Sequence, residues 1–351
     1  MKAIVLKECC EMEVEGEPRK NKALPLKKYP LEITELPKPV PKAGQILIKV
    51  SACGICHTEL DEIEGRLTPP NFPVVPGHEV VGEVAALGAD VTRFKTGNRV
   101  GIAWINSTCG ACKFCERGDE NLCDQFRATG LHAHGGYAQY TAVSESFAYP
   151  IPDVFSDVQA APLLCAGVVG YRALRLSGIK PGGKLGLFGF GASAHMAIQV
   201  AKYWDCRVFV FTRKGRTGHQ NLATKLGADW VGSTEDQPPE KLDCAIDFTP
   251  VGDPVREALR AIEKGGRVVI NAIRKVEPIP ELDYTKTLWH EKELKSVANV
   301  TRQDVLEFLP LAAEIGIAPE VQVFDPERIN DALLILKKGR MQGAGVLKMP
   351  H

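Results

Sequence analysis

The sequence has no excess of charge of either sign and no long hydrophobic run. Its 351 residues include 43 lysines and arginines against 43 aspartates and glutamates, whereas proteins that bind nucleic acid or anionic membranes usually carry a basic excess. No segment approaches the roughly 18 consecutive apolar residues of a membrane-spanning helix, and the first residues, MKAIVLKECC, lack the apolar core of a secretory signal. We therefore expect a cytoplasmic protein with no nucleic-acid partner and no membrane partner.

Internal repeats and low-complexity segments are also missing. The composition, 44% hydrophobic and 25% charged residues, is that of a globular protein, and the length suits two domains of roughly 100–200 residues each. Cysteine, in contrast, is abundant, with eleven residues. In a reducing cytosol, clustered cysteines usually bind metal or act in catalysis. Five of them fall in no metal-binding pattern and are expected to be small apolar residues: Cys9, Cys10, Cys53, Cys206 and Cys244.

The two halves of the chain differ in their patterns. Residues 1–150 consist of short β-forming runs broken by glycine and proline, which predicts an irregular antiparallel β domain. Within it, the polar, lysine-rich stretch 8–30 is expected to be a surface loop or an extended hairpin. From residue 162 onward, helix-length segments alternate with apolar runs such as KLGLF, RVFVF and CAIDF. This alternation predicts a parallel sheet covered by helices on both faces.

Four cysteines stand close together in the pattern C-x2-C-x2-C-x7-C: Cys109, Cys112, Cys115 and Cys123. Four thiolates at this spacing can surround one zinc ion tetrahedrally and leave no position open, which is the arrangement of a structural site. The alternatives are an iron–sulfur cluster and a chance grouping of free thiols. The bacterial ferredoxin run, however, has a shorter last spacing followed by proline. We expect a structural zinc site in this segment.

Other metal-binding side chains are scattered: Cys56, His78, Glu79 and Cys165. Two thiolates and one imidazole would make three zinc ligands and leave a fourth position open, as in catalytic zinc sites. Each residue also has an ordinary explanation, because Cys165 lies in an apolar run that suits a core and His78 beside Glu79 suits a polar surface. Neither composition nor periodicity brings these residues together, so both interpretations stay open at this point.

A glycine-containing segment, GFGASA, follows an apolar strand and precedes a helical pattern, which is the setting of the dinucleotide-binding fingerprint. The first glycine allows a tight turn, and the second lets the backbone approach a pyrophosphate at the helix N-terminus. A helix–sheet core without nucleotide is the alternative. The cofactor-binding candidates are Gly189, Gly191, Ala192, Ser193 and Ala194.

The end of the next strand bears on the choice of cofactor. NAD-binding proteins carry an acidic residue about 20 positions after the glycine turn, but here the strand is followed by Thr212, Arg213 and Lys214. A hydroxyl and two cations suit the 2′-phosphate of NADP, which arginine can bind through two parallel hydrogen bonds. The sequence therefore favours NADP(H) over NAD(H), with a solvated basic turn as the alternative.

Taken together, the segments CGICHTEL, PGHEVVGEV, the four-cysteine pattern, GGYAQY, APLLCAG and GFGASA give the chain a family resemblance. It resembles the zinc-dependent alcohol dehydrogenases of the medium-chain dehydrogenase/reductase superfamily over nearly its whole length, and LDYTKTLWHEKELKSVANVTRQD resembles their propanol-preferring, bacterial and archaeal branch. The implied α/β fold has a GroES-like irregular β catalytic domain (1–165 and 297–351, with a structural zinc lobe at 106–124). A Rossmann domain with a doubly wound parallel sheet (166–296) completes it. The active site would lie between the domains, and a homo-oligomer, either dimer or tetramer, is expected.

The resemblance also implies roles for individual residues. Cys56, His78 and Cys165 match the ligands of a catalytic zinc, and Glu79 matches a carboxylate beside that metal. Thr58 matches the hydroxyl that passes on the substrate proton, and Trp104 matches an aromatic wall of the substrate pocket. The chain departs from the family pattern at several positions: Asp61 replaces a histidine, Glu59 is longer than the usual acid, Val169 replaces a threonine, and Gly343-Ala344 replaces Gly-Arg.

The implied function is hydride transfer between a nicotinamide and a small primary alcohol or its aldehyde. Thr58 would pass on the hydroxyl proton, and two zinc ions would be held per chain, the catalytic one acting as a Lewis acid. Alternatives on the same scaffold are reduction of ketones, polyols, cinnamyl-type aldehydes or a conjugated double bond. A non-enzymatic zinc module is a remote alternative, because the lobe is not basic, and the complete ligand set disfavours an inactive relative.

Overall fold

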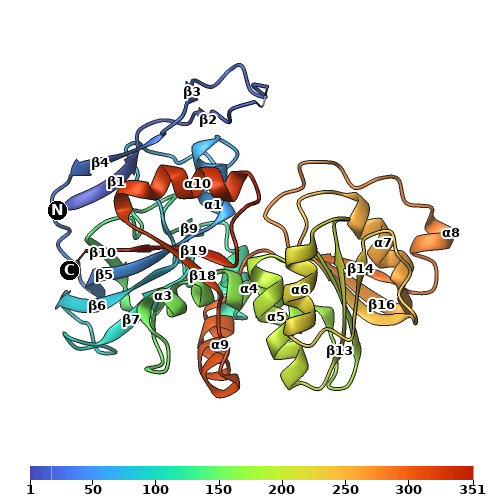
Figure 1. Ribbon diagram of the computed structural model, residues 1–351. Helices are drawn as coiled ribbons and strands as arrows, with labels where there is room; N and C mark the ends of the chain where they lie inside the picture. Colours follow the sequence, from blue (N-terminus) through green and yellow to red (C-terminus); the bar gives the residue numbers. More distant parts are fainter. Residues whose placement is uncertain (17, 351) are drawn as a thin grey trace. The chain divides into compact units, whose positions relative to one another are not determined.

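The computed structural model describes residues 1–16 and 18–350, which form two units of different architecture (Figure 1). The first unit comprises Met1–Cys165, Thr301–Pro310 and the chain from Pro319 onward, and the second comprises Ala166–Val300 and Leu311–Ala318. Helix α9 (Arg302–Ile315) therefore contributes residues to both units. Among the described residues, no helix is both long and apolar enough to cross a membrane.

The first unit is built on a mostly antiparallel seven-stranded sheet with the order β11-β7-β6-β5-β19-β18, in which β10 also pairs with β5. The strands of this sheet are β5 (Gln45–Ile55), β6 (Val80–Leu87), β7 (Arg99–Ile102), β10 (Tyr140–Ser144), β11 (Ala148–Pro150), β18 (Val321–Phe324) and β19 (Ala344–Lys348). Short two-stranded sheets pair β1 (Lys2–Leu6) with β4 (Leu31–Glu35) and β8 (Ile105–Ser107) with β9 (Arg127–Ala128). The irregular antiparallel β structure expected from the glycine- and proline-broken runs is present.

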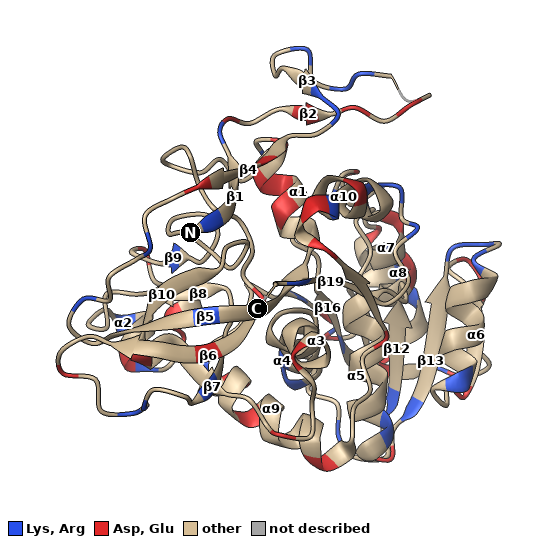
Figure 2. Ribbon diagram, turned by 60° about the vertical axis from the view of Figure 1, so that its left-hand side comes forward, with Lys and Arg blue, Asp and Glu red and all other residues tan. Residues whose placement is uncertain are grey.

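Short helices connect these strands: α1 (His57–Ile63), α2 (Lys113–Glu116), α3 (Asp157–Ala160), α10 (Ile329–Lys337) and the 3-10 turns Glu120–Leu122, Glu145–Phe147, Ala161–Leu164 and Pro326–Arg328. Helices α1 and α10 lie side by side (Figure 1). Figure 2 shows that acidic residues gather on α1, which carries Glu59, Asp61 and Glu62. The core beneath them is apolar and includes Leu60, Ile63 and Leu333. Helix α1 thus holds an unusual density of buried carboxylates at the edge of a hydrophobic core.

The described residues of the polar stretch 8–30, which are 8–16 and 18–30, extend from the body of the first unit as an arm (Figure 1). Its two short strands, β2 (Glu11–Met12) and β3 (Leu26–Lys27), pair in parallel. The arm is therefore a surface loop closed by a parallel pair rather than the hairpin that was the second expectation, because a hairpin needs antiparallel strands.

The second unit is a six-stranded parallel sheet with the order β14-β13-β12-β15-β16-β17. The strands are β12 (Lys184–Phe188), β13 (Arg207–Thr212), β14 (Trp230–Ser233), β15 (Leu242–Asp247), β16 (Ile262–Ile270) and β17 (Glu293–Ser296). The helices are α4 (Ala166–Ser177), α5 (Ala192–Tyr203), α6 (Thr217–Lys225), α7 (Asp253–Ala261) and α8 (Tyr284–Thr287). This strand order is that of the doubly wound dinucleotide-binding fold, which brings the carboxyl ends of β12 and β13 to one edge.

Candidate active site

Four metal-binding side chains from three parts of the first unit meet at one point. Cys56 immediately precedes α1, His78 and Glu79 immediately precede β6, and Cys165 lies at the end of the Ala161–Leu164 turn. One potential ligand atom of each residue lies within 4.8 Å of the others. The histidine and the glutamate are buried, whereas both cysteines are partly exposed. The cluster therefore combines two buried residues with two cysteines that keep some contact with solvent.

The imidazole of His78 is oriented for metal binding. Its Nδ1 lies 2.7 Å from Oε1 of Glu59, and the whole ring is buried. Its Nε2 is also buried and has no hydrogen-bond partner among the described residues. A carboxylate that accepts from one ring nitrogen leaves the lone pair of the other free for a metal ion. The unpartnered Nε2, facing two thiols and a carboxylate, fits a zinc ion in this cluster.

Glu59 has a position that sequence reasoning did not assign. Besides its contact with His78, its Oε2 accepts a hydrogen bond from the backbone N–H of Cys56 at 2.7 Å. The carboxylate therefore closes the first turn of α1 as part of a capping box and holds two of the metal-binding residues at once. The signal in the sequence was the spacing of Cys56 and Glu59, which places both on one turn of a helix.

The charges in the cluster are strongly coupled. A hydrogen bond with Cys165 holds the pKa of Cys56 well below its usual value, and the same bond, together with burial, raises the pKa of Cys165. Burial also raises the pKa of Glu79 well above that of an ordinary carboxyl group. A cysteine binds zinc as its thiolate, so the lowered pKa of Cys56 is in keeping with a role as a ligand.

The position of Glu79 depends on a glycine. A Cβ atom at Gly54 would lie 1.8 Å from Oε2 of Glu79, so no other residue fits beneath this carboxylate without displacing it. The carbonyl of Gly54 also accepts a hydrogen bond from the hydroxyl of Tyr137 at 3.2 Å. The backbone at the end of β5 therefore packs directly against the carboxylate of Glu79.

Further predicted residues surround the four. The hydroxyl of Thr58 lies 3.6 Å from Sγ of Cys56. The ring of Trp104 meets that of His78 edge-on, with centroids 6.5 Å apart. Asp61, in contrast, is 1% exposed and forms an ion pair with Arg66 at 2.6 Å. Thr58 and Trp104 thus border the cluster, while the carboxylate of Asp61 is bound by a guanidinium.

The four cysteines of the C-x2-C-x2-C-x7-C segment form a second cluster, with sulfur–sulfur distances of 3.6 to 3.8 Å. Sulfur atoms held at about 2.3 Å by one tetrahedral zinc would lie about 3.8 Å apart, so the donor set and its spacing fit a zinc ion. All the cysteines of the described residues are free thiols. Nearby, the buried carboxylate of Glu120 accepts hydrogen bonds from the backbone and side chain of Arg302 at 2.8 and 3.0 Å. This contact joins the lobe to the start of α9.

The glycine segment of the second unit forms the turn between β12 and α5. Gly189 has a φ of +85°, which favours glycine, and its N–H donates to the carbonyl of Phe211 at 2.7 Å. Gly191 is exposed and precedes α5, which begins at Ala192. Ala192 and Ser193 are partly buried and Ala194 is fully buried. The first N–H groups of α5 therefore lie at an exposed turn, as an anion site requires.

The predicted phosphate-binding residues at the end of β13 differ in exposure. Arg213 and Lys214 are exposed, whereas Thr212 is 1% exposed and its hydroxyl accepts a hydrogen bond from Nε2 of Gln220 at 3.0 Å. Arg216, which sequence reasoning did not single out, is exposed in the same turn, and its N–H donates to the carbonyl of Arg213. Three cations therefore share this turn, while the threonine anchors α6.

Comparison with known proteins places this chain in a family. Residues 42–153 match the family described as "Alcohol dehydrogenase GroES-like domain", and residues 192–314 match "Zinc-binding dehydrogenase". A "Probable alcohol dehydrogenase AdhA" from Mycobacterium tuberculosis (strain CDC 1551 / Oshkosh) is 44% identical over 92% of this chain and 94% of its own length. The chain belongs to the zinc-type alcohol dehydrogenases of the medium-chain dehydrogenase/reductase superfamily. It is thus an alcohol dehydrogenase, an enzyme of the oxidoreductase class, as the resemblance predicted.

Solved structures confirm the fold of this alcohol dehydrogenase, a GroES-like unit with a Rossmann unit. The cinnamyl alcohol dehydrogenase SbCAD4 from Sorghum bicolor is 27% identical, with a TM-score of 0.84 and coverage of 99% of this chain and 98% of that one. The acetophenone reductase from Geotrichum candidum NBRC 4597, solved in complex with NAD, is 25% identical, with a TM-score of 0.81 and coverage of 98% and 97%.

Proposed function

We propose that this alcohol dehydrogenase holds two zinc ions per chain and uses NADP(H) to interconvert small primary alcohols and their aldehydes. The observation that carries the proposal is the pair of sulfur-rich clusters. The Cys56 cluster includes a buried imidazole nitrogen without a partner among the described residues, and the four-cysteine cluster has tetrahedral spacing. The first supplies the catalytic site and the second a structural one.

When bound, the catalytic zinc supplies a Lewis acid that polarises the substrate oxygen and lowers the pKa of an alcohol. Cys56, His78 and Cys165 would hold it. Glu59 keeps Nε2 of His78 free as a ligand by accepting from Nδ1. The Thr58 hydroxyl, beside the Cys56 sulfur, accepts the proton that the alcohol loses and passes it outward. Trp104, edge-on to His78, forms a wall that suits a small substrate.

The glycine turn at residues 189–194 would bind the cofactor pyrophosphate through the exposed N-terminus of α5. Arg213, Lys214 and Arg216 would surround the 2′-phosphate, because no carboxylate stands among residues 212–218 to bind a free ribose hydroxyl. The buried Thr212 supports this turn through Gln220 rather than contacting the phosphate.

The test of cofactor choice is a matrix of kcat/KM values for NADPH and NADH with purified enzyme. We expect NADPH to be preferred and Arg213→Ala to lower kcat/KM for NADPH by roughly tenfold or more, with little change for NADH. Arg207→Ala removes an exposed arginine from the opposite end of the same strand and serves as the control. A preference of the wild type for NADH would overturn the assignment.

A second substrate class is kept because of the structural relatives. Because the solved structures similar to this chain include a cinnamyl alcohol dehydrogenase and an acetophenone reductase, larger aldehydes and ketones are the alternative substrates. A panel of ethanol, 1-propanol, 2-propanol, cinnamaldehyde and acetophenone separates these classes. The proposal requires the highest kcat/KM for a small primary alcohol or its aldehyde.

We also propose a homo-oligomer. Strand β17 ends the sheet of the second unit, and among the described residues only β16 pairs with it. Leu294 on this strand and the nearby Trp289 and Tyr284 are exposed by 38%, 51% and 60%. An exposed strand edge with large apolar side chains commonly marks an interface. Light scattering after gel filtration should give a mass of two or four chains, and a monomer would contradict this.

A further inference from the structure

The carboxyl end of α1 is held both by the residues that follow it and by a part of the first unit that is distant in the sequence. The last carbonyl groups of a helix have no partner within it and need donors from elsewhere. Here each of the last four accepts at least one hydrogen bond. The donors are Arg66 Nη2 for Leu60 (3.3 Å), the Arg66 and Leu67 N–H groups for Asp61 (2.9 and 3.0 Å), Cys9 Sγ for Glu62 (3.4 Å) and the Cys10 N–H for Ile63 (2.8 Å). The base of the arm thus caps the helix.

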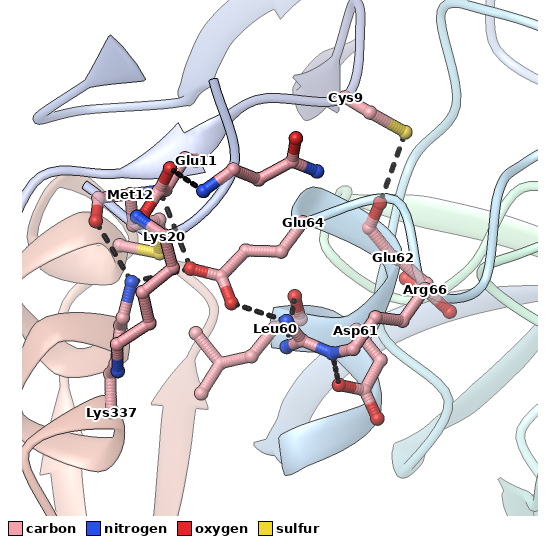
Figure 3. A network of polar contacts seen from close by, with 11 residues as sticks. Cys9, Glu11, Met12, Lys20, Leu60, Asp61, Glu62, Glu64, Arg66 and Lys337 are labelled. Carbon is pink, nitrogen blue, oxygen red and sulfur yellow. Dashed lines mark hydrogen bonds and ion pairs between the residues drawn. The ribbon is translucent and has the colours of Figure 1, made fainter. Parts of the chain in front are cut away.

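A charged network completes this cap (Figure 3). Glu64, the C-cap residue that follows α1, accepts hydrogen bonds from Nζ of Lys337 on α10 and from Nη1 of Arg66, the latter at 2.7 Å. Lys337 also donates to the carbonyl of Met12 in β2 at 2.8 Å, and the Met12 N–H lies 3.4 Å from Oε1 of Glu64. One carboxylate and one ammonium therefore tie α1, α10 and the arm together.

Burial makes this ion pair different from an ordinary surface pair. The side chains of Lys337 and Glu64 are only 16% and 10% exposed, so solvent screens their attraction weakly. Burial alone would raise the pKa of Glu64, but the hydrogen bonds from Lys337 and Arg66 outweigh it and lower that pKa. The Glu64 carboxylate is thus held in its ionised form, and its contact with Lys337 joins residues 273 positions apart.

The other end of α1 carries the candidate metal site. Helix α1 has seven residues, with Cys56 as its N-cap and Glu59, which contacts His78, in its first turn. In a helix of seven residues, a displacement of Glu64 would displace Cys56 and Glu59 as well. A displacement of the ligand atoms by about 1 Å is enough to weaken a metal site.

We propose that Glu64 and Lys337 are positioning residues for the catalytic metal site. Together with residues 9–12 at the base of the arm, they form a clamp on the carboxyl end of α1. The inference rests on the proposed function for the identity of the metal. Neither residue touches the metal or the substrate; they act through α1 on Cys56 and Glu59.

The experiment measures zinc release from the zinc-loaded enzyme to a chromogenic chelator. Two variants assign the phases of zinc release. Cys56→Ser should remove the phase that belongs to the catalytic site, and Cys112→Ser should remove the phase that belongs to the four-cysteine lobe. We expect Lys337→Met and Glu64→Gln each to speed release from the catalytic site by roughly tenfold and to leave the lobe unchanged. The double variant should add little to either change, and Lys337→Arg should restore slow release.

Glu32→Gln is the matched control. Glu32 on β4 forms an ion pair with Lys7, which directly follows β1; both side chains are about half exposed, and neither residue belongs to α1. This variant should release zinc at the wild-type rate. A lower Tm with an unchanged release rate in both network variants would overturn the proposal, since the pair would then be merely structural. Absence of a Cys56-dependent zinc from the wild type would overturn the metal assignment as well. If the wild type fails to oxidise alcohols but Lys337→Met and Glu64→Gln still release zinc faster, the proposed function is refuted and the positioning role of the two residues is supported.

Discussion

Replacing Glu59 with glutamine tests how the carboxylate beneath His78 supports metal binding. Both oxygens of Glu59 are used, Oε1 by Nδ1 of His78 and Oε2 by the N–H of Cys56, each at 2.7 Å, and Glu59 is fully buried. Glutamine keeps one acceptor but replaces the other by a donor and removes the charge. A hydrogen bond to a charged group contributes about 1.5–3 kcal/mol, which corresponds to roughly ten- to 150-fold in affinity.

The assay is competition for zinc with a chelator of known affinity, using protein in which the Cys109–Cys123 lobe stays loaded. Glu62→Gln is the matched control. Glu62 lies on the same helix and is equally buried, but neither of its carboxylate oxygens has a hydrogen-bond partner among the described residues, and burial raises its pKa well above the usual value. We expect Glu59→Gln to weaken zinc binding within that range and Glu62→Gln to leave it unchanged. Equal weakening in both variants, or wild-type affinity in Glu59→Gln, would refute the reasoning.

Three further perturbations have definite expected outcomes. Cys112→Ser should remove the lobe zinc and lower the Tm by several degrees while the other zinc stays bound, as metal analysis and calorimetry would show. The pKa of Glu64 is lower in the folded protein than in the unfolded chain, so its stabilising contribution is present above the unfolded pKa and is lost as pH falls through the folded pKa. Lys337→Met should therefore reduce the loss of unfolding free energy at acid pH, measured by denaturant titrations at several pH values. Gly54→Ala places a Cβ against the carboxylate of Glu79 and should reduce kcat at least tenfold, whereas unchanged activity would show that this carboxylate is free to move.

Local patterns in the sequence predicted the parts of the protein that are local in space. The lobe cysteines lie within 15 residues of one another, and the glycine turn joins a strand directly to its helix, so spacing alone indicates their chemistry. The strand order of the second unit follows from alternating strands and helices in the same way.

Contacts between distant residues were beyond such reasoning. Cys56, His78 and Cys165 meet because the long strand β5 and the turn before α4 end at the same place, which no periodicity reveals. Only a resemblance to known enzymes suggested that they belong together. The contact of Lys337 with Glu64 joins the last turn of α10 to the end of α1, and an ordinary surface lysine and glutamate would look the same in the sequence.

The most direct test of the central claim is the zinc content of the purified wild type and of Cys56→Ser, measured together with NADPH-linked aldehyde reduction on the same samples. We expect two zinc ions per wild-type chain and one in the variant, which should keep its fold and lose turnover. Full turnover by a variant that has lost the Cys56-dependent zinc would contradict the claim.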